Sequence, residues 1–268
     1  MNARPFLLTA EYHETIWGVT DLEPWFRPRP GKTGEVWFTR GGAEPLPILV
    51  KFIFTSERLS VQVHPGDAYA QAHEGCGGKT EMWYVLRAAP GARLAAGFRE
   101  SITPERARQA ALSGEIEILL RWFPAEAGQV YFIPSGTVHA LGAGLVVCEI
   151  QQNNPITYRL YDYGRPRELH LDKAMDVARF ETHPGPSLPA GSLLASCEYF
   201  SVERLEVAAT RYQPDASRFH LLVVLEGSGL IDGQWFQPGQ AWYVPAGAEP
   251  FALDAEPRAV LLRTSLPL

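Results

Sequence analysis

Four side chains of types that bind metal ions lie between residues 62 and 139. Gln62 and His64 are two residues apart in an apolar run, so on a strand they project from the same face. Glu81 opens a later β-type run, and His139 follows a Pro-Ser-Gly turn. Two neutral imidazoles, a carboxylate and an amide oxygen suit zinc and similar divalent ions, and such a set can leave positions open for water or substrate. If these strands pair, the residues alone are compatible with a metal site.

Short β-type runs must position these residues. Gly and Pro are frequent, with 24 and 22 residues, and they separate runs rich in β-branched and aromatic residues. This pattern predicts an all-β sandwich or barrel. The predicted strands are residues 46–54, 59–63, 82–86, 130–133, 145–150, 220–225 and 241–244.

A small helical insertion is predicted near residues 103–123. Thr103 is a favourable N-cap residue, Pro104 suits the first helical position and Gly114 can close the helix. A second helical segment is expected over 116–123. A further helix is predicted over 171–180, with its N-cap near His170.

An internal repeat indicates two similar β-units. Residues 128–139 align without gaps to residues 239–250, and both segments read Gly-x5-Pro-x-Gly. The first copy ends on His139, whereas the second ends on Pro250, which has no metal-binding side chain. We therefore expect a catalytic, metal-binding unit over 1–181 and a degenerate unit without a metal site over 182–268, joined by a Pro- and Gly-rich linker.

Composition describes an ordinary globular protein. The 268 residues are 46% hydrophobic and 20% charged, and the formal net charge is −6. This weak acidity argues against nucleic acid or an anionic membrane as partner. Three cysteines without paired spacing argue against a disulfide framework, and the N-terminal apolar stretch is too short for a signal peptide. A reducing cytoplasm is the expected location, and the oligomeric state stays open.

The motif that delivers His139 resembles the second sequence motif of the cupins. Several stretches together more specifically resemble type I phosphomannose isomerases of the short bacterial branch. These stretches are Trp17-Gly18 and residues 34–37, 59–65, 78–84, 128–139, 149–153 and 157–159. The resemblance implies a mainly β, double-stranded β-helix sandwich with two cupin-like units. It also implies interconversion of mannose 6-phosphate and fructose 6-phosphate, so a small sugar phosphate is the expected partner.

The resemblance implies roles for individual residues as well. One divalent metal ion, usually zinc, would have four ligands: Gln62, His64, Glu81 and His139. Lys79 and Arg159 would lie in the substrate pocket. Isomerisation moves a proton between C1 and C2, so it needs a base and a group that stabilises an oxyanion. Arg159 offers a planar fork for phosphate or oxyanion, Lys79 a phosphate-binding charge or a base, and Glu149 a second candidate base.

Other interpretations stay open at this level. The family often has Ser-Asp where this chain has Asn154-Pro155, so any role of that aspartate is lost or supplied elsewhere. A non-catalytic sugar-phosphate-binding cupin and another metal cupin enzyme, such as an epimerase, are the alternatives. Arg159 could instead pair with Asp162. Lys51 and Arg165 are expected to be solvated, and His170 is expected to cap a helix.

Overall fold

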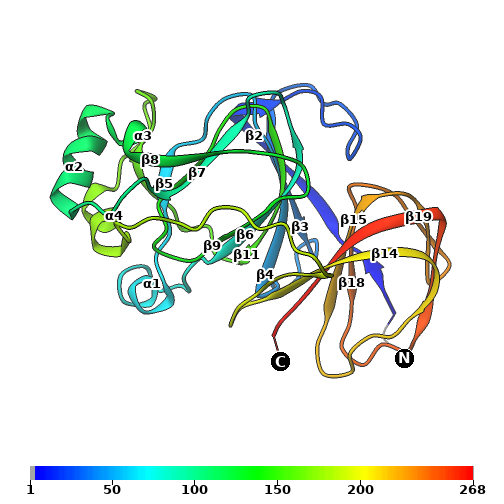
Figure 1. Ribbon diagram of the computed structural model, residues 1–268. Coiled ribbons are helices and arrows are strands. Elements are labelled where there is room, and N and C mark those ends of the chain that lie inside the picture. The colour runs from blue at the N-terminus through cyan, green and yellow to red at the C-terminus, as the bar shows by residue number, and fades with distance from the viewer. Residues whose placement is uncertain (1–3, 268) are drawn as a thin grey trace.

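The computed structural model describes residues 4–267 and arranges them in layers. From left to right in Figure 1, a group of helices is followed by a five-stranded, a six-stranded and an eight-stranded sheet, all antiparallel. Hydrophobic clusters fill the spaces between these layers. The mainly β architecture predicted from the sequence is confirmed.

The six-stranded sheet is the central layer. Its strands, in spatial order, are β2 (Thr9–Val19), β3 (Thr33–Thr39), β4 (Ile48–Phe54), β11 (Leu145–Gln152), β6 (Glu81–Ala88) and β9 (Val130–Ile133). Strands β4 and β11 are buried along their whole length because another layer covers each face of the sheet. This explains why both read as nearly continuous apolar runs rather than alternating ones.

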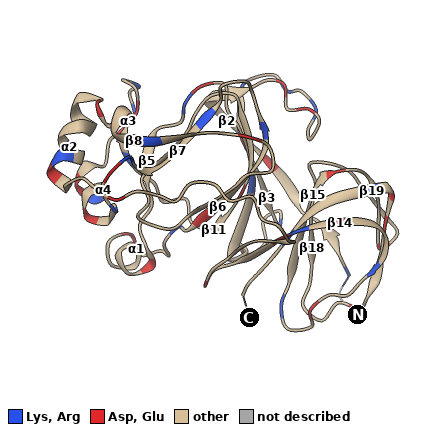
Figure 2. Ribbon diagram, in the orientation of Figure 1, with Lys and Arg blue, Asp and Glu red and all other residues tan. Residues whose placement is uncertain are grey.

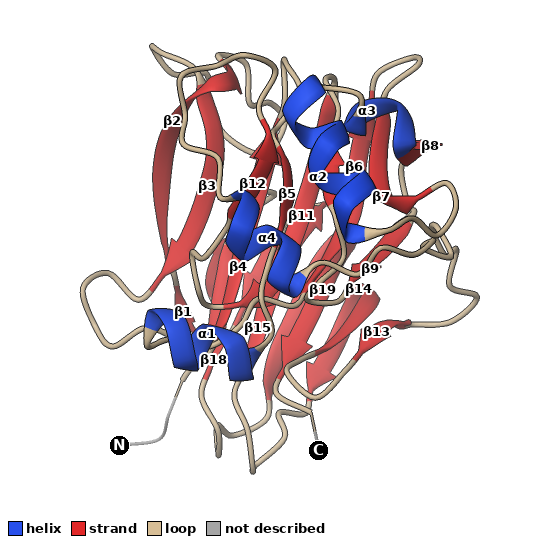
Figure 3. Ribbon diagram, turned by 90° about the vertical axis from the view of Figure 1, so that its left-hand side faces the viewer, coloured by secondary structure: helices blue, strands red, loops and turns tan. Residues whose placement is uncertain are grey.

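The five-stranded sheet faces the six-stranded sheet on one side and the helices on the other (Figure 3). Its strands, in spatial order, are β12 (Tyr158–Tyr161), β5 (Val61–Val63), β10 (His139–Leu141), β7 (Arg93–Phe98) and β8 (Leu120–Pro124). The helices are α1 (Asp67–Glu74), α2 (Pro104–Ser113), α3 (Ile116–Leu119) and α4 (Leu171–Val177). The two sheets of this sandwich enclose the residues considered below.

The eight-stranded sheet is built mainly from the C-terminal part of the chain. Its strands are β1 (Phe6–Leu7), β18 (Ala241–Val244), β15 (His220–Glu226), β19 (Phe251–Ser265), β14 (Ser201–Tyr212) and β13 (Leu193–Ser196), with β16 (Gly229–Ile231) beside β19 and β17 (Gln234–Phe236) beside β16. Strand β1 pairs with β18, so the start of the chain contributes to this sheet. The two-unit division at residue 182 stays a prediction.

The predicted helices are found, with two corrections. Helix α2 has the predicted caps, since Thr103 accepts a hydrogen bond from the Arg106 amide and Gly114 is left-handed. The predicted helix over 116–123 is wrong beyond Leu119, because the next residues pair with β7 as strand β8. The helix predicted to reach residue 180 ends at Val177, since the following chain turns to hydrogen-bond with Gly136.

Charged residues of both signs are distributed over helices, loops and strands (Figure 2). Within residues 4–267, no helix is both long and apolar enough to cross a bilayer.

Candidate metal centre and active-site pocket

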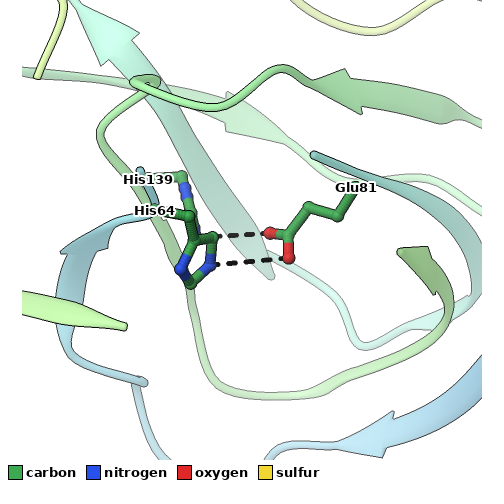
Figure 4. A group of neighbouring side chains, drawn as sticks. All are labelled: His64, Glu81 and His139. Carbon is green, nitrogen blue, oxygen red and sulfur yellow. Dashed lines mark ion pairs between the residues drawn. The ribbon is translucent and has the colours of Figure 1, made fainter. Parts of the chain in front are cut away.

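Two facing sheets bring three of the four predicted ligands together. His64 directly follows β5 and His139 opens β10, whereas Glu81 opens β6 on the opposite sheet. The nearest atoms are Nε2 of His139 and Oε1 of Glu81 at 3.3 Å, and Nε2 of His64 and Oε2 of Glu81 at 3.5 Å (Figure 4). One ligand atom from each residue lies within 4.8 Å of the others, and all three side chains are buried.

Both imidazoles are oriented by backbone carbonyls. Nδ1 of His64 donates to the Ile156 carbonyl at 2.8 Å, and Nδ1 of His139 donates to the Thr137 carbonyl at 2.9 Å. Because Nδ1 carries the proton in both rings, Nε2 is the unprotonated nitrogen and faces Glu81. Metal-binding histidines commonly have their tautomer fixed by a hydrogen bond of this kind from the other ring nitrogen. Burial keeps both rings neutral, lowering the pKa of His139 to about 4 and that of His64 well below its usual value.

Glu81 provides the test of whether a cation fits. Its two oxygens are buried, and neither has a well-formed hydrogen bond, although Oε2 lies 2.9 Å from Nζ of Lys79. Burial and the nearby charge of Glu149 raise the pKa of Glu81 to about 7. A buried carboxylate that lacks well-formed hydrogen bonds is costly. A divalent cation held by Glu81 and the two neutral imidazoles would remove that cost, so these residues fit a metal ion.

The fourth predicted ligand, Gln62, lies beside the cluster rather than in it. On strand β5 it is the cross-strand neighbour of His139. Its amide nitrogen lies 3.2 Å from Nε2 of His139, and its oxygen accepts a hydrogen bond from Ser60 at 3.2 Å. A half-turn of the amide would exchange the two atoms and present the oxygen to the cluster.

Lys79 lies at the same donor atoms. Its Nζ is 3.1 Å from Nε2 of His64 and 2.9 Å from Oε2 of Glu81. Lys79 and Glu81 therefore direct their side chains to the same cluster. The ammonium stands in for the positive charge that a metal ion would bring to these donors.

Glu149 joins the cluster to a second buried lysine. Its Oε1 lies 2.9 Å from Nζ of Lys51 and 4.0 Å from Nζ of Lys79, and its Oε2 accepts a hydrogen bond from the Trp83 indole at 2.8 Å. Burial alone would raise the pKa of Glu149, but the two lysines outweigh it and lower the pKa to about 2. Glu149 is thus a fixed carboxylate at neutral pH.

The prediction that Lys51 is solvated is wrong. Its side chain is buried, with a second ion pair to Glu35 at 3.3 Å, and it lies 4.9 Å from the centre of the Trp37 ring. Lys51 is the cross-strand neighbour of both Glu149 and Trp37. A lysine in the middle of the apolar run that forms β4 was the signal that could have identified this position.

Arg159 lines the same pocket from the five-stranded sheet. It is the cross-strand neighbour of Gln62, so Arg159, Gln62 and His139 lie side by side on strands β12, β5 and β10. Its Nε is buried without a hydrogen-bond partner. Burial and the positive charge of Arg167 lower the pKa of Arg159. Both observations suit an anion at this guanidinium.

The alternative partner of Arg159 is already engaged. Asp162 accepts two hydrogen bonds from Arg167, at 2.6 and 2.7 Å, and lies 3.2 Å from Arg165. Arg165 is therefore an ion-pair residue rather than a solvated one. His170 stands at the N-cap of α4, as expected, but its side chain makes no capping hydrogen bond, and its Nδ1 accepts the Arg159 amide at 3.2 Å instead.

Comparison with known proteins identifies the family. No family model matches the chain. Mannose-6-phosphate isomerase ManA of Bacillus subtilis is 31% identical, over 95% of this chain and 97% of that protein. Mannose-6-phosphate isomerase of Streptococcus mutans is 32% identical, over 85% of this chain and 87% of that protein. The chain belongs to the mannose-6-phosphate isomerase family.

The three-dimensional comparison agrees with this membership. The crystal structure of the mannose 6-phosphate isomerase from Bacillus subtilis superimposes with a TM-score of 0.83 at 30% identity, over 97% of this chain and 99% of that one. The cupin-type fold and the family expected from the sequence are therefore confirmed. In this member of the mannose-6-phosphate isomerase family, the cluster of His64, Glu81 and His139 lies between the five-stranded and six-stranded sheets. In the C-terminal part of the chain, large apolar side chains fill the interior around β15, β18 and β19.

Proposed function

We propose that this protein interconverts mannose 6-phosphate and fructose 6-phosphate at a single bound divalent metal ion. The observation that carries the proposal is one pocket lined by His139 of the buried cluster, by Lys79 and by Arg159, whose Nε has no hydrogen-bond partner among the described residues. A metal donor set and an anion-binding fork in one pocket suit a phosphorylated sugar whose reacting carbonyl and phosphate lie at opposite ends.

His64, Glu81 and His139 would hold the metal, with Gln62 joining them once its amide is turned. Zinc is the metal we propose, because two imidazoles and one carboxylate are typical of catalytic zinc sites. When bound, the ion would polarise the sugar oxygens at C1 and C2 and stabilise negative charge that develops there.

The remaining pocket residues divide the other tasks. Arg159 would bind the phosphate or the developing oxyanion through its planar fork. Lys79, at the metal donors, would move the proton between C1 and C2. Glu149 is ionised and held by Lys51 and Trp83, so we assign it the task of orienting the two lysines rather than that of the base.

Pro155 lines the pocket at the position where the family often has aspartate. A prolyl side chain carries no titratable group, so it supplies no proton transfer. Lys79 lines this pocket and lies within 3.1 Å of donor atoms of both His64 and Glu81, which is why the proton transfer is assigned to it.

The division of labour between the two units also belongs to this proposal. Residues 1–181 would carry the chemistry, and residues 182–268 would form a second unit without a metal site. A cytoplasmic location is proposed as well, in line with Cys76, Cys148 and Cys197, which are all unpaired among the described residues.

A coupled assay tests the activity. Purified protein loaded with zinc is mixed with mannose 6-phosphate, and fructose 6-phosphate is measured through a linked dehydrogenase. We expect turnover that disappears after chelation and returns with zinc. Binding of mannose 6-phosphate without turnover would favour the sugar-phosphate-binding alternative, and a different sugar phosphate as product would favour an epimerase.

A further inference from the structure

The segment that delivers Lys79 and Glu81 is held entirely by hydrogen bonds from outside itself. Residues 78–80 precede strand β6 and belong to no strand. The Lys79 amide donates to the Pro65 carbonyl at 3.0 Å, and the Gly78 carbonyl accepts from the Asn154 side chain at 3.0 Å. The Thr80 amide donates to Oε1 of Gln152 at 2.7 Å. The position of Lys79 therefore depends on these partners.

Asp67 organises the outer end of this arrangement. This residue begins helix α1, and its Oδ1 accepts hydrogen bonds from the Gly78 amide at 2.7 Å and from Nε2 of Gln152 at 3.0 Å. The same Gln152 amide group thus bonds Asp67 with its nitrogen and Thr80 with its oxygen. Gly78 fits closely here, because a Cβ at this position would lie 2.6 Å from the Asp67 amide nitrogen.

The remaining oxygen of Asp67 is bound by a residue from the C-terminal part of the chain. The Tyr199 hydroxyl donates to Oδ2 of Asp67 at 2.9 Å. Tyr199 lies in the tight turn between β13 and β14, closed by a hydrogen bond from the Cys197 amide to the Phe200 carbonyl at 2.9 Å. Phe200 is fully buried and packs edge-on against Phe132 of strand β9.

The turn is therefore anchored before Tyr199 makes its bond. A hydroxyl on a rigid turn loses little conformational entropy when it binds, so its contact can hold Asp67 in one orientation. Although burial alone favours the neutral acid, the bonds from Gly78, Tyr199 and Gln152 keep the pKa of Asp67 below its usual value. Asp67 consequently accepts all three bonds as a carboxylate, and hydrogen bonds to charged acceptors are the stronger kind.

We infer that Tyr199 is a positioning residue of the active site, acting through Asp67 and Gln152 on the segment that carries Lys79 and Glu81. The inference rests on the proposed function for its effect on turnover. It gives the C-terminal unit a task in catalysis although that unit lacks the His64, Glu81 and His139 set. Tyr199 itself touches neither Lys79 nor Glu81.

The test compares Tyr199→Phe with a matched control, Tyr69→Phe. Tyr69 lies on α1 and, like Tyr199, donates its hydroxyl to a carboxylate, here Oδ2 of Asp176 at 2.9 Å, but this bond does not lead to residues 78–80. Each variant deletes one hydroxyl and keeps the ring. Melting temperature, zinc release to a chelator, hydrogen exchange of residues 78–81 and steady-state kinetics with mannose 6-phosphate are measured on both.

Changes to groups that orient metal ligands typically cost 10–100-fold in affinity or activity. Tyr199 acts less directly, through Asp67 and Gln152, so a smaller effect is expected. For Tyr199→Phe we therefore expect kcat to fall about 3–10-fold with KM within about twofold, zinc release to accelerate by a similar factor, and exchange at 78–80 to increase. The control should leave kcat, KM, zinc release and exchange at wild-type values.

Equal effects of the two variants, or wild-type zinc release and exchange in Tyr199→Phe, would refute the inference. If the wild-type protein does not convert mannose 6-phosphate, the proposed function fails, while zinc release and exchange still decide the role of Tyr199. A second pair adds a check: in an Asp67→Asn background, Tyr199→Phe should add little, since both act through one contact.

Discussion

Replacing Lys79 with methionine separates metal binding from proton transfer. Methionine keeps most of the packing of the lysine stem and removes only the charge. That charge lies 2.9 Å from Oε2 of Glu81 and 4.0 Å from Oε1 of Glu149. Lys51 remains as the counter-ion of Glu149 at 2.9 Å, so only Glu81 loses its single cation.

The expected magnitude follows from these contacts. Positioned acid–base groups contribute about 10²–10⁴-fold to rate, which is about 3–5 kcal/mol of activation free energy. If Lys79 moves the proton, kcat of Lys79→Met should fall by that factor. If Lys79 only attracts phosphate, the loss should appear mainly in KM. Metal binding should persist or tighten, because a positive charge leaves the donor atoms.

The comparison variant is Glu81→Gln, which removes the single carboxylate of the cluster. We expect zinc affinity to fall by more than about 100-fold, since altering the partners of metal ligands already costs 10–100-fold. Lys173→Met is the matched control for Lys79→Met. Lys173 also pairs with a glutamate, Glu74, at 2.6 Å, but its side chain is 45% exposed and lies on helix α4, outside the two sheets that carry the donor atoms.

The assay combines zinc content after dialysis with steady-state kinetics on mannose 6-phosphate for all three variants. Normal kinetics in Lys79→Met would show that Lys79 is a bystander, and the proton transfer would then have to be sought at Glu149. Loss of zinc from Lys79→Met would show that the lysine supports the metal site itself, against the reasoning above.

Three further outcomes are expected. Arg159→Lys should lower kcat/KM for mannose 6-phosphate by more than about 10-fold with little change in melting temperature, because a point charge cannot replace a bidentate fork. Activity that falls only in proportion to the folded fraction would contradict a role of Arg159 in binding the substrate. Elemental analysis should give one zinc per chain, lost in His139→Ala, and a zinc ion located near Pro250 would refute the two-unit interpretation. Burial lowers the pKa of His220 to about 4, whereas in the unfolded chain the value is about 6.5. As the pH falls, the unfolded state therefore binds the proton first, and the folded state loses stability between about pH 6.5 and pH 4. Urea unfolding of His220→Asn should accordingly show a weaker pH dependence than the wild type, and identical slopes would exclude this residue.

Much of the metal centre could be predicted from local patterns. The alternation of a strand places Gln62 and His64 on one face, and the glycine and proline turn before His139 ends one strand and starts another. These features depend on residues near one another in sequence. Convergence of His64, Glu81 and His139 depends on which strands pair, and the family resemblance supplied that information.

The surroundings of the centre could not be predicted in the same way. Lys51 is an isolated cation in an apolar strand, and only the register with β11 and β3 shows that Glu149 and Glu35 neutralise it. The bond between Tyr199 and Asp67 joins residues 132 positions apart, and no local pattern in the sequence links the two. The strand β8 was misassigned because pairing with β7 overrides the local helical preference.

One apolar core is shared by the six-stranded and eight-stranded sheets. Phe52 and Cys148 of the first pack in the same cluster as Leu221, Val223 and Leu262 of the second. Neither sheet can leave the other without exposing this surface to water, at about 25 cal/mol for each Å² of apolar area. Heating should therefore melt the protein in one cooperative transition, with calorimetric and van't Hoff enthalpies in agreement, and a fragment ending at residue 181 should aggregate rather than fold alone.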